Sequence, residues 1–138
     1  MSESTTEVWK EFGENEITHS AAHHLLAIYE LHEKRGYARV TDVAKFLEIT
    51  TGSASTNLKS LKAKGLIDED DNKFLSLSAE GRRLTEAILS RRTILEEFFT
   101  KVLGVSEEQA SIDACKTEHL LSDETTKKMS KMSANWAR

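Results

Sequence analysis

The sequence predicts a mostly helical α+β chain, in which a winged helix-turn-helix domain is followed by a second, helical domain. Two segments with helical periodicity, 42–48 and 53–64, are separated by the short polar turn 50–52, which is the spacing of a helix-turn-helix. Short apolar stretches then flank the turn residues 70–72, as in a β-hairpin that would form the wing. The helical pattern over 78–102 is longer than the first domain needs, so it leads into the second domain.

The composition indicates a chain with one core and at most a small second cluster. Of its 138 residues, 38% are hydrophobic and 30% are charged. The most apolar stretch, 25–29, is too short to cross a membrane, and no export signal precedes it. We therefore expect a cytoplasmic protein with no membrane partner. The single cysteine, Cys115, cannot form an internal disulfide, so it is a buried core residue, a reactive thiol or a metal ligand.

The net charge of −4 hides a basic segment. Between residues 39 and 67, five basic residues stand against two acidic ones, a balance of +3 that leaves −7 for the rest of the chain. Contacts with nucleic-acid phosphates require cations. The cations are concentrated where the helix-turn-helix is predicted.

The chain divides into three predicted parts. These are an acidic N-terminal arm, 1–17, the winged helix-turn-helix domain, 18–80, and the helical domain, 81–138. The first helix of the winged helix-turn-helix domain has Thr18 or Ser20 as its N-cap and ends near Lys34. Thr41 is the predicted N-cap of helix 42–48.

The remaining elements follow from cap and turn residues. Gly65 ends helix 53–64, and the predicted strands of the wing are 66–68 and 74–77. Ser78 caps the long helix over 78–102. Ser106 forms a capping box for a further helix that runs to Leu121, and Ser122 begins a last helix.

The outer face of helix 53–64 predicts contact with DNA. Its apolar side chains fall on one side, and Thr56, Lys59 and Ser60 fall on the other. A helix fits the major groove, where hydroxyls and lysines meet base edges and phosphates. The full set of predicted DNA-binding residues is Thr41, Thr51, Ser53, Thr56, Lys59, Ser60, Lys62 and Lys73. The alternative is a winged helix that binds protein, whose lysines are only a solvated surface.

A second constellation predicts a metal site. Cys115, Glu118 and His119 are three and four residues apart, which puts them on one helical face. Thiolate, carboxylate and imidazole are together ligands for a divalent transition metal rather than for calcium or magnesium. A fourth ligand would come from the His23-His24 pair. Cys115 as an ordinary core residue remains open.

A catalytic interpretation of the same residues has less support. In it, Cys115 would be a nucleophile activated by His119. No glycine-rich oxyanion loop or substrate-binding motif accompanies the pair, so we expect no enzyme activity.

Several segments together resemble the diphtheria-toxin-repressor and manganese-transport-regulator family of metal-dependent bacterial repressors. The segments that carry the resemblance are 23–31, 39–47, 61–67, 77–81, 103–104 and 114–119. The resemblance implies a homodimer joined through the second domain, so that 81–138 becomes a dimerisation and metal-binding domain. It also implies a palindromic double-stranded operator, which a two-fold symmetric dimer would match.

Carried over from the family, the primary metal site falls on Cys115, Glu118 and His119, as in its iron-responsive branch. The manganese branch has a glutamate where Cys115 stands. The ligand of the first helix, methionine or aspartate in the two branches, aligns with His23. The resemblance therefore implies the ligand set His23, Cys115, Glu118 and His119, with ferrous iron favoured and zinc or manganese as the other candidates.

Other family ligands are absent at the matching positions. Thr93 stands where both branches have a histidine, Ser111 replaces an ancillary histidine, and Leu26 replaces a carboxylate of the manganese branch. Of the ancillary site only Glu97 matches. We therefore expect one ion per subunit. Because the sequence ends at Arg138, we also expect no additional C-terminal domain of the kind that the longer iron-type members have.

The combined prediction is a repressor that senses a divalent metal, most simply Fe²⁺, and controls metal-homeostasis genes. Two alternatives remain. One is a metal-independent winged-helix regulator that responds to a small ligand, for which DNA binding would be insensitive to a chelator. The other is a winged-helix protein-interaction module with a structural zinc, which would have no sequence-specific affinity for DNA.

Overall fold

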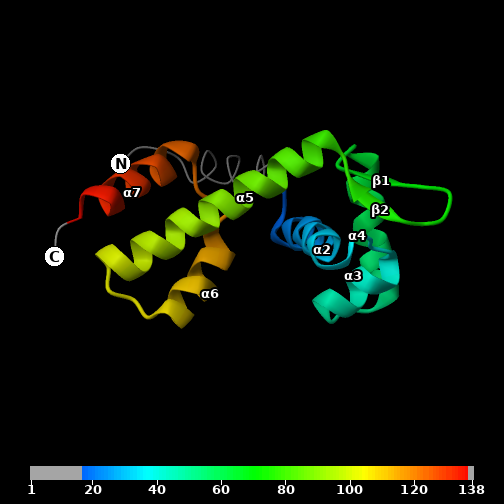
Figure 1. Ribbon diagram of the computed structural model, residues 1–138, viewed down its shortest axis with the longest axis horizontal. Coiled ribbons are helices and arrows are strands. Elements are labelled where there is room, and N and C mark those ends of the chain that lie inside the picture. The colour runs from blue at the N-terminus through cyan, green and yellow to red at the C-terminus, as the bar shows by residue number, and fades with distance from the viewer. Residues whose placement is uncertain (1–16, 137–138) are drawn as a thin grey trace, which may run out of the picture. The chain divides into compact units, whose positions relative to one another are not determined.

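The computed structural model describes residues 17–136, so the predicted arm 1–17 lies almost entirely outside the described residues. The chain forms two compact units, which we call the head unit (His19–Ala87) and the helical unit (from Ile88 onward), and each is described by itself. The elements, all but η1 labelled in Figure 1, are α2 (His19–Arg35), α3 (Val40–Leu47), α4 (Thr51–Ala63), β1 (Ile67–Glu69), β2 (Leu75–Leu77), α5 (Ala79–Glu97), the π-helix η1 (Phe98–Val102), α6 (Glu107–Thr117) and α7 (Asp123–Asn135).

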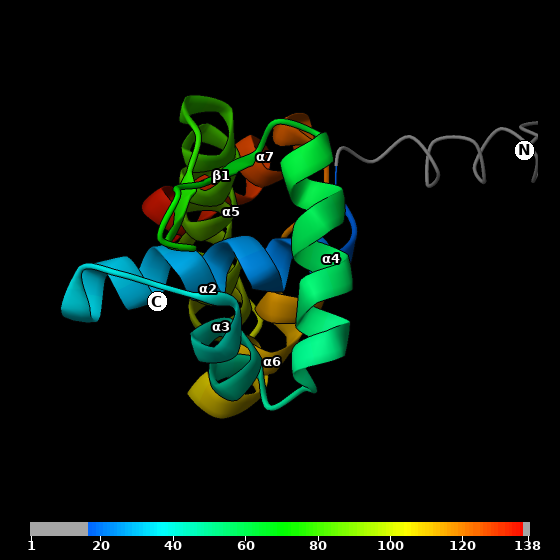
Figure 2. The same cartoon turned by 90° about the vertical axis from the view of Figure 1, so that its right-hand side faces the viewer.

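The head unit is the predicted winged helix-turn-helix. Helices α2, α3 and α4 pack against one another, and Figure 2 shows α4 running across the direction of α2. The core between them holds Leu25 and Ile28 of α2, Val43 of α3 and Leu61 of α4, all at most 1% exposed. Burying side chains of this size supplies about 1.5 to 3 kcal/mol each, which holds the three helices in place.

The N-terminus of α3 corrects the prediction that Thr41 is its N-cap. The helix begins at Val40 and the N-cap is Arg39, in extended backbone at φ −124° and ψ 168°. The Arg39 N–H donates to the carboxylate of Asp42 at 2.9 Å. An acidic side chain three residues into a helix can hold the cap in this way, so a hydroxyl at the cap position is unnecessary. Thr41 lies inside the helix with an exposed side chain.

The predicted helix 53–64 begins two residues earlier than expected. The Thr50 hydroxyl oxygen accepts the Ser53 N–H at 3.1 Å, which makes Thr50 the N-cap of α4. Thr51 and Gly52, expected in the turn, are therefore the first residues of the helix.

The predicted wing is an antiparallel hairpin in which Ile67 pairs with Leu77. At its tip, one carboxylate oxygen of Asp70 accepts the N–H groups of Asn72 and Phe74, at 2.8 and 2.9 Å. At its base, the His32 ring Nε2 of α2 donates to the Leu75 carbonyl at 2.7 Å. The wing is thus tied to the helices rather than only following them in sequence.

The junction between the wing and α5 depends on a close backbone approach. The Ser78 hydroxyl donates to the Gly65 carbonyl at 2.7 Å and accepts the Gly81 N–H at 3.0 Å, so Ser78 caps α5 as predicted. A Cβ at Gly81 would overlap the carbonyl oxygen of Leu66. Glycine is required here because only a residue without a side chain lets α5 approach the backbone just before β1 so closely.

The helical unit shows a π-helical turn that the sequence pattern does not reveal. The long predicted helix is helical throughout 79–102, but its last five residues form η1 instead of continuing α5. The Thr100 hydroxyl donates to the Glu96 carbonyl at 2.9 Å, which is the acceptor that the Thr100 N–H would use in an α-helix. Gly104, at φ +74°, then ends the segment.

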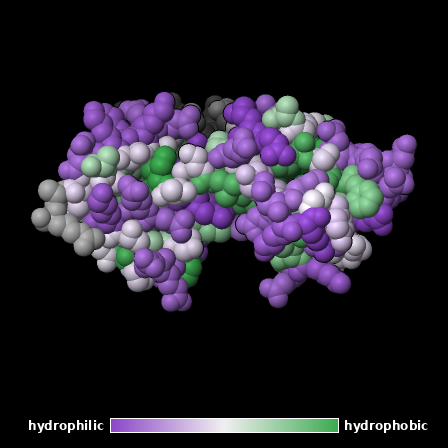
Figure 3. Space-filling model, viewed as in Figure 1, coloured by the Kyte–Doolittle hydropathy of each residue, from purple (hydrophilic) through white to green (hydrophobic). Residues whose placement is uncertain are grey.

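Helices α6 and α7 begin at the predicted caps. Ser106 accepts the Gln109 N–H and Ser122 accepts the Thr125 N–H, each at 3.2 Å. The prediction that the first of these helices runs to Leu121 is wrong, since α6 ends at Thr117 and a turn follows. Within the described residues, none of the helices is long and apolar enough to pass through a membrane. The face drawn in Figure 3 is predominantly hydrophilic.

Candidate DNA-binding surface and metal centre

The exposed face of α4 carries the residues predicted to meet DNA. Ala54, Leu58 and Leu61 are at most 3% exposed. The eight predicted DNA-binding residues are all exposed, namely Thr41, Thr51, Ser53, Thr56, Lys59, Ser60, Lys62 and Lys73. The predicted division of this helix into an inner apolar face and an outer polar face is therefore present. Contact with DNA itself stays a prediction.

A hollow of about 250 Å³ separates α4 from the wing. Three lysines line it, Lys59 and Lys62 from α4 and Lys73 from the wing, around an apolar floor that includes Leu58 and Leu75. The Lys62 ammonium donates to Glu69 at 2.8 Å, and this hydrogen bond lowers the pKa of Glu69. Lys62 uses one of its three N–H donors and much of its charge on Glu69, so it is less available to a phosphate than an unpaired lysine would be.

A cluster of arginines and aromatic rings beside the wing was missed by the sequence analysis. The Arg39 guanidinium lies 4.3 Å from the centre of the Phe74 ring, and that of Arg35 lies 4.5 Å from the Tyr37 ring. The two rings meet edge to face at 5.9 Å. Stacking of this kind fixes a guanidinium while its N–H groups can still donate outward. Alternating arginine and aromatic residues over 35–39 were the available signal.

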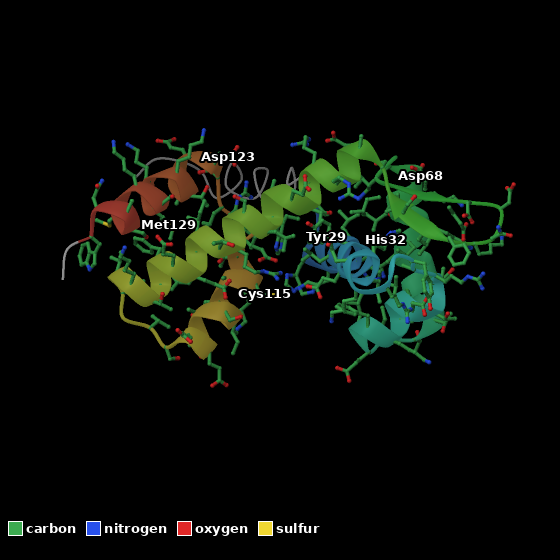
Figure 4. The ribbon with its side chains drawn as sticks, viewed as in Figure 1. Tyr29, His32, Asp68, Cys115, Asp123 and Met129 are labelled. Atoms are coloured by element: carbon green, nitrogen blue, oxygen red, sulfur yellow. The ribbon has the colours of Figure 1, made fainter. Side chains whose placement is uncertain are left out.

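The predicted metal ligands of the helical unit are near neighbours in sequence at the end of α6, but their ligand atoms do not gather into one group that could hold an ion in this structure. Cys115 is in the helix, Glu118 is its C-cap in right-handed helical backbone, and His119 is the next residue. Glu118 is 1% exposed and His119 is 9% exposed, whereas Cys115 is partly exposed. Figure 4 shows Cys115 on α6 and Asp123 at the start of α7. The three side chains come from one short segment, as their spacing requires.

Glu118 is bound by an arginine that the sequence analysis did not consider. Arg92 of α5 donates its Nε to one carboxylate oxygen at 2.5 Å and its Nη2 to the other at 2.7 Å. Arg91, the preceding residue, donates to the Glu118 backbone carbonyl at 3.0 Å and to Asp123 at 2.7 Å. The end of α6 is therefore held by two adjacent arginines of α5.

These contacts set the electrostatics of the site. The hydrogen bonds from Arg92 to Glu118 raise the pKa of the guanidinium above its ordinary value. Burial raises the pKa of the Cys115 thiol, and the Glu118 charge adds to that rise. A thiol in this state is protonated near neutral pH, so metal ligation would have to release its proton.

The donor types fit a divalent transition metal, although Glu118 fits less directly than the sequence implied. Sulfur from Cys115 and imidazole nitrogen from His119 are ordinary ligands for such an ion. Both oxygens of Glu118 accept from Arg92, but each oxygen of a carboxylate has a second acceptor position. Glu118 can therefore ligate only by sharing an oxygen with Arg92 or by releasing it.

The histidines of α2 are distinguished by their surroundings. His24 is 2% exposed, its Nδ1 lies 2.7 Å from the Ser20 carbonyl, and its Nε2 has no hydrogen-bond partner among the described residues. The ring of His23 is less buried and lies 4.3 Å from that of His19. The ring of His32 donates a hydrogen bond to the Leu75 carbonyl of the wing. His23 belongs to the head unit, so the complete ligand set of His23, Cys115, Glu118 and His119 remains a prediction.

Two family models match most of the chain. Residues 16–74 match the model described as the N-terminal DNA-binding domain of iron-dependent repressors. Residues 78–138 match the model described as the metal-binding and dimerisation domain of iron-dependent repressors.

Individual proteins agree with the family models. The chain is 32% identical over 105 residues to the transcriptional regulator MntR of Lysinibacillus sphaericus, which covers 76% of this chain and 75% of that protein. It is 24% identical over 121 residues to the iron-dependent repressor IdeR of Mycobacterium leprae, covering 88% of this chain and 53% of that protein. The chain thus spans about half the length of the iron-type relative.

A solved structure shares the fold. It is a manganese-dependent transcriptional repressor in complex with manganese, with a TM-score of 0.73, 24% identity, and coverage of 86% of this chain and 54% of the other. At this level of identity the likeness concerns the fold alone.

Proposed function

This chain belongs to the family of iron-dependent repressors, and from that premise we propose that it is a homodimeric regulator whose affinity for operator DNA is switched by a divalent transition metal. The observation that supports this most directly is the position of Cys115, Glu118 and His119, three donors of the types that a divalent transition metal binds, at the end of α6. They lie in the part of the chain that matches the family's metal-binding and dimerisation domain.

The proposed ligands are His23, Cys115, Glu118 and His119, with one ion per subunit. The residues at the positions of the family's second metal site argue for a single ion, because most of them are not ligands. Leu26 is buried at 4% exposure and is not a donor, and the Thr93 hydroxyl donates to the Leu89 carbonyl at 3.2 Å. Of the ancillary ligands that the family resemblance implies, Glu97 alone has a match in this chain.

We favour Fe²⁺ as the physiological ion because Cys115 supplies a thiolate. Soft sulfur ligands suit iron and zinc, whereas manganese prefers oxygen donors. The similarity to MntR keeps manganese as an alternative. Zn²⁺ is a third candidate, since two imidazoles, a thiolate and a carboxylate also suit tetrahedral coordination.

The coupling to DNA follows from where the proposed ligands lie in the chain. His23 belongs to the head unit, and the other three belong to the helical unit. Coordination by all four would restrict motion between the units. Two heads of a dimer must meet successive major grooves about 34 to 36 Å apart, so this restriction would favour the DNA-competent spacing on a palindromic operator.

The deciding experiment is a set of operator-binding titrations. Binding is measured after chelation, and then with iron, manganese, zinc, cobalt and nickel added separately. We expect chelation to abolish tight binding and one or more metals to restore it. Binding that is insensitive to the chelator would favour a metal-independent regulator. Retained metal without affinity for any operator would favour a protein-interaction module with a structural zinc.

The ligand assignment has its own test. With Co²⁺ bound, a thiolate-to-metal charge-transfer band is expected and should disappear in Cys115→Ser. Thiolate ligation releases a proton, so Co²⁺ affinity should fall as pH is lowered. An identical spectrum with and without the thiol would remove Cys115 from the site.

A further inference from the structure

The contact between Arg92 and Glu118 is the most buried ion pair among the described residues. The Glu118 side chain is 1% exposed and that of Arg92 is 24% exposed. The other ion pairs in the described part of the chain have at least one partner that is 40% or more exposed. The geometry is also the strongest available to these groups, because two parallel N–H donors of the guanidinium meet both carboxylate oxygens.

This pairing changes what Glu118 offers to a metal ion. The guanidinium neutralises the charge for which a carboxylate is valued as a ligand. It also occupies one acceptor position on each oxygen. An ion that approached Glu118 would have to displace the guanidinium or bind next to its positive charge. Either event costs free energy that an unpaired carboxylate would not require.

Arg91 provides a contrast on the same helix. It carries the same charge, one residue away, but its partners are the Glu118 backbone carbonyl and the Asp123 carboxylate. Arg91 therefore holds the turn between α6 and α7 without touching the carboxylate of Glu118. A comparison of substitutions at the two arginines therefore separates the effect of a nearby positive charge from the effect of direct pairing with the Glu118 carboxylate.

We propose that Arg92 is the residue that sets the metal affinity of this site, because its guanidinium competes with the ion for the Glu118 carboxylate. In the metal-free protein the Glu118 carboxylate is neutralised by the Arg92 guanidinium, and a metal ion must displace that guanidinium or share the carboxylate with it. The consequence is a metal site of reduced affinity. The sensor therefore binds the ion only at a higher free concentration than a site with an unpaired carboxylate would require. This inference rests on the proposed metal-dependent function and adds to it a determinant of the sensing threshold.

The test is a comparison of Co²⁺ affinity in the full chain, measured by absorption titration against a competing chelator. Arg92→Met should bind Co²⁺ about tenfold more tightly than the wild type or better, which is the scale of one charge-assisted hydrogen bond. Arg92→Lys, which keeps the charge but loses the bidentate geometry, should show a smaller gain. Arg91→Met is the matched comparison and should bring no gain in Co²⁺ affinity, because it removes a neighbouring charge without freeing the Glu118 carboxylate.

A double-mutant comparison makes the test specific. In a Glu118→Gln background, the further change Arg92→Met should bring no gain, because the contested carboxylate is gone. If Arg92→Met does not fold, Arg92→Lys carries the test by itself, and it must still bind more tightly than the wild type.

Several outcomes would overturn the inference. If neither arginine variant binds Co²⁺ more tightly, or if the gain survives in the Glu118→Gln background, Arg92 does not compete for Glu118. If in addition Cys115→Ser loses Co²⁺ while Glu118→Gln keeps it, the metal site of the proposed function survives and Glu118 is only a structural ion-pair partner. Absence of Co²⁺ binding in the wild type and in every variant would overturn the inference and the proposed function together.

Discussion

The head unit and the helical unit present their candidate functional residues in opposite ways. On the head unit the predicted DNA contacts are exposed. In the helical unit, Glu118 and His119 are 1% and 9% exposed, and Glu118 is paired with an arginine 26 residues earlier in the chain. A DNA groove can be met by donors on a surface, whereas metal ligands must be held in place and partly removed from water. Substitutions of the predicted DNA contacts should therefore alter DNA binding without altering the free energy of unfolding. Substitutions in the candidate metal site should alter both metal binding and the free energy of unfolding.

The largest expected effect contrasts one ion pair from each unit. Arg92→Met leaves the buried Glu118 carboxylate without its partner, and breaking a buried pair in this way costs about 3 to 5 kcal/mol. Arg83→Met removes the pairing with Glu80, in which both side chains are more than half exposed, and should leave stability close to the wild type. Urea unfolding of both variants gives the comparison. Similar midpoints for the two would mean that Glu118 relaxes into water when its partner is lost.

The head unit allows the same substitution to be compared at two glycines, Gly81 at the junction between the wing and α5 and Gly52 in α4. Gly81→Ala places a Cβ against the Leu66 carbonyl and should destabilise the protein by about 1 to 3 kcal/mol. At Gly52, an added Cβ would meet nothing within 4 Å, and alanine in a helix should be neutral or stabilising by roughly 0.5 to 1 kcal/mol. Thermal unfolding distinguishes them. Equal shifts in melting temperature would contradict the close approach of α5 to the strand.

The helices of both units could be predicted from sequence where local signals define them. The hydroxyl caps Ser106 and Ser122 act at the positions expected, because a cap contacts an N–H only three residues away. The prediction failed at Thr41, since a cap can also be held from within the helix by Asp42, and the residue type alone does not decide between these arrangements.

The candidate metal site could be predicted only in part, because some of its contacts are not local in sequence. The spacing of Cys115, Glu118 and His119 indicates that they share a helix end, because that relation is local. The pairing of Glu118 with Arg92 depends on how α5 packs against α6, and no spacing rule reports it. The π-helical turn at Phe98–Val102 was missed because a segment of five residues is too short to change the apolar periodicity of the long helix.

The outer face of α4 can be tested against an exposed lysine of the helical unit. Lys59→Ala should weaken operator binding by about 1 to 3 kcal/mol if Lys59 contacts a base, or reduce the salt slope by about one unit if it contacts a phosphate. Lys128→Ala removes one charge from α7 and should change neither quantity. Fluorescence anisotropy over a range of salt concentrations measures both. An unchanged affinity and slope for Lys59→Ala would remove this residue from the interface.

The smallest expected effect compares equivalent caps in the two units. Thr50→Ala and Ser106→Ala each remove a hydroxyl oxygen that accepts an N–H three residues later, at 3.1 and 3.2 Å, and each should cost about 1 kcal/mol of stability. Their effects on DNA should differ, because Thr50 fixes the start of α4 and thereby the positions of Thr51 and Ser53. Thr50→Ala should weaken operator binding beyond what its loss of stability explains, since the metal-loaded protein remains almost fully folded after a change of that size. Ser106→Ala should leave binding unchanged.

Measuring the unfolding midpoint and the operator affinity of both variants at one metal concentration makes the comparison direct. If both caps change DNA affinity equally, the start of α4 is not part of the recognition surface, and only the residues further along that helix remain candidates.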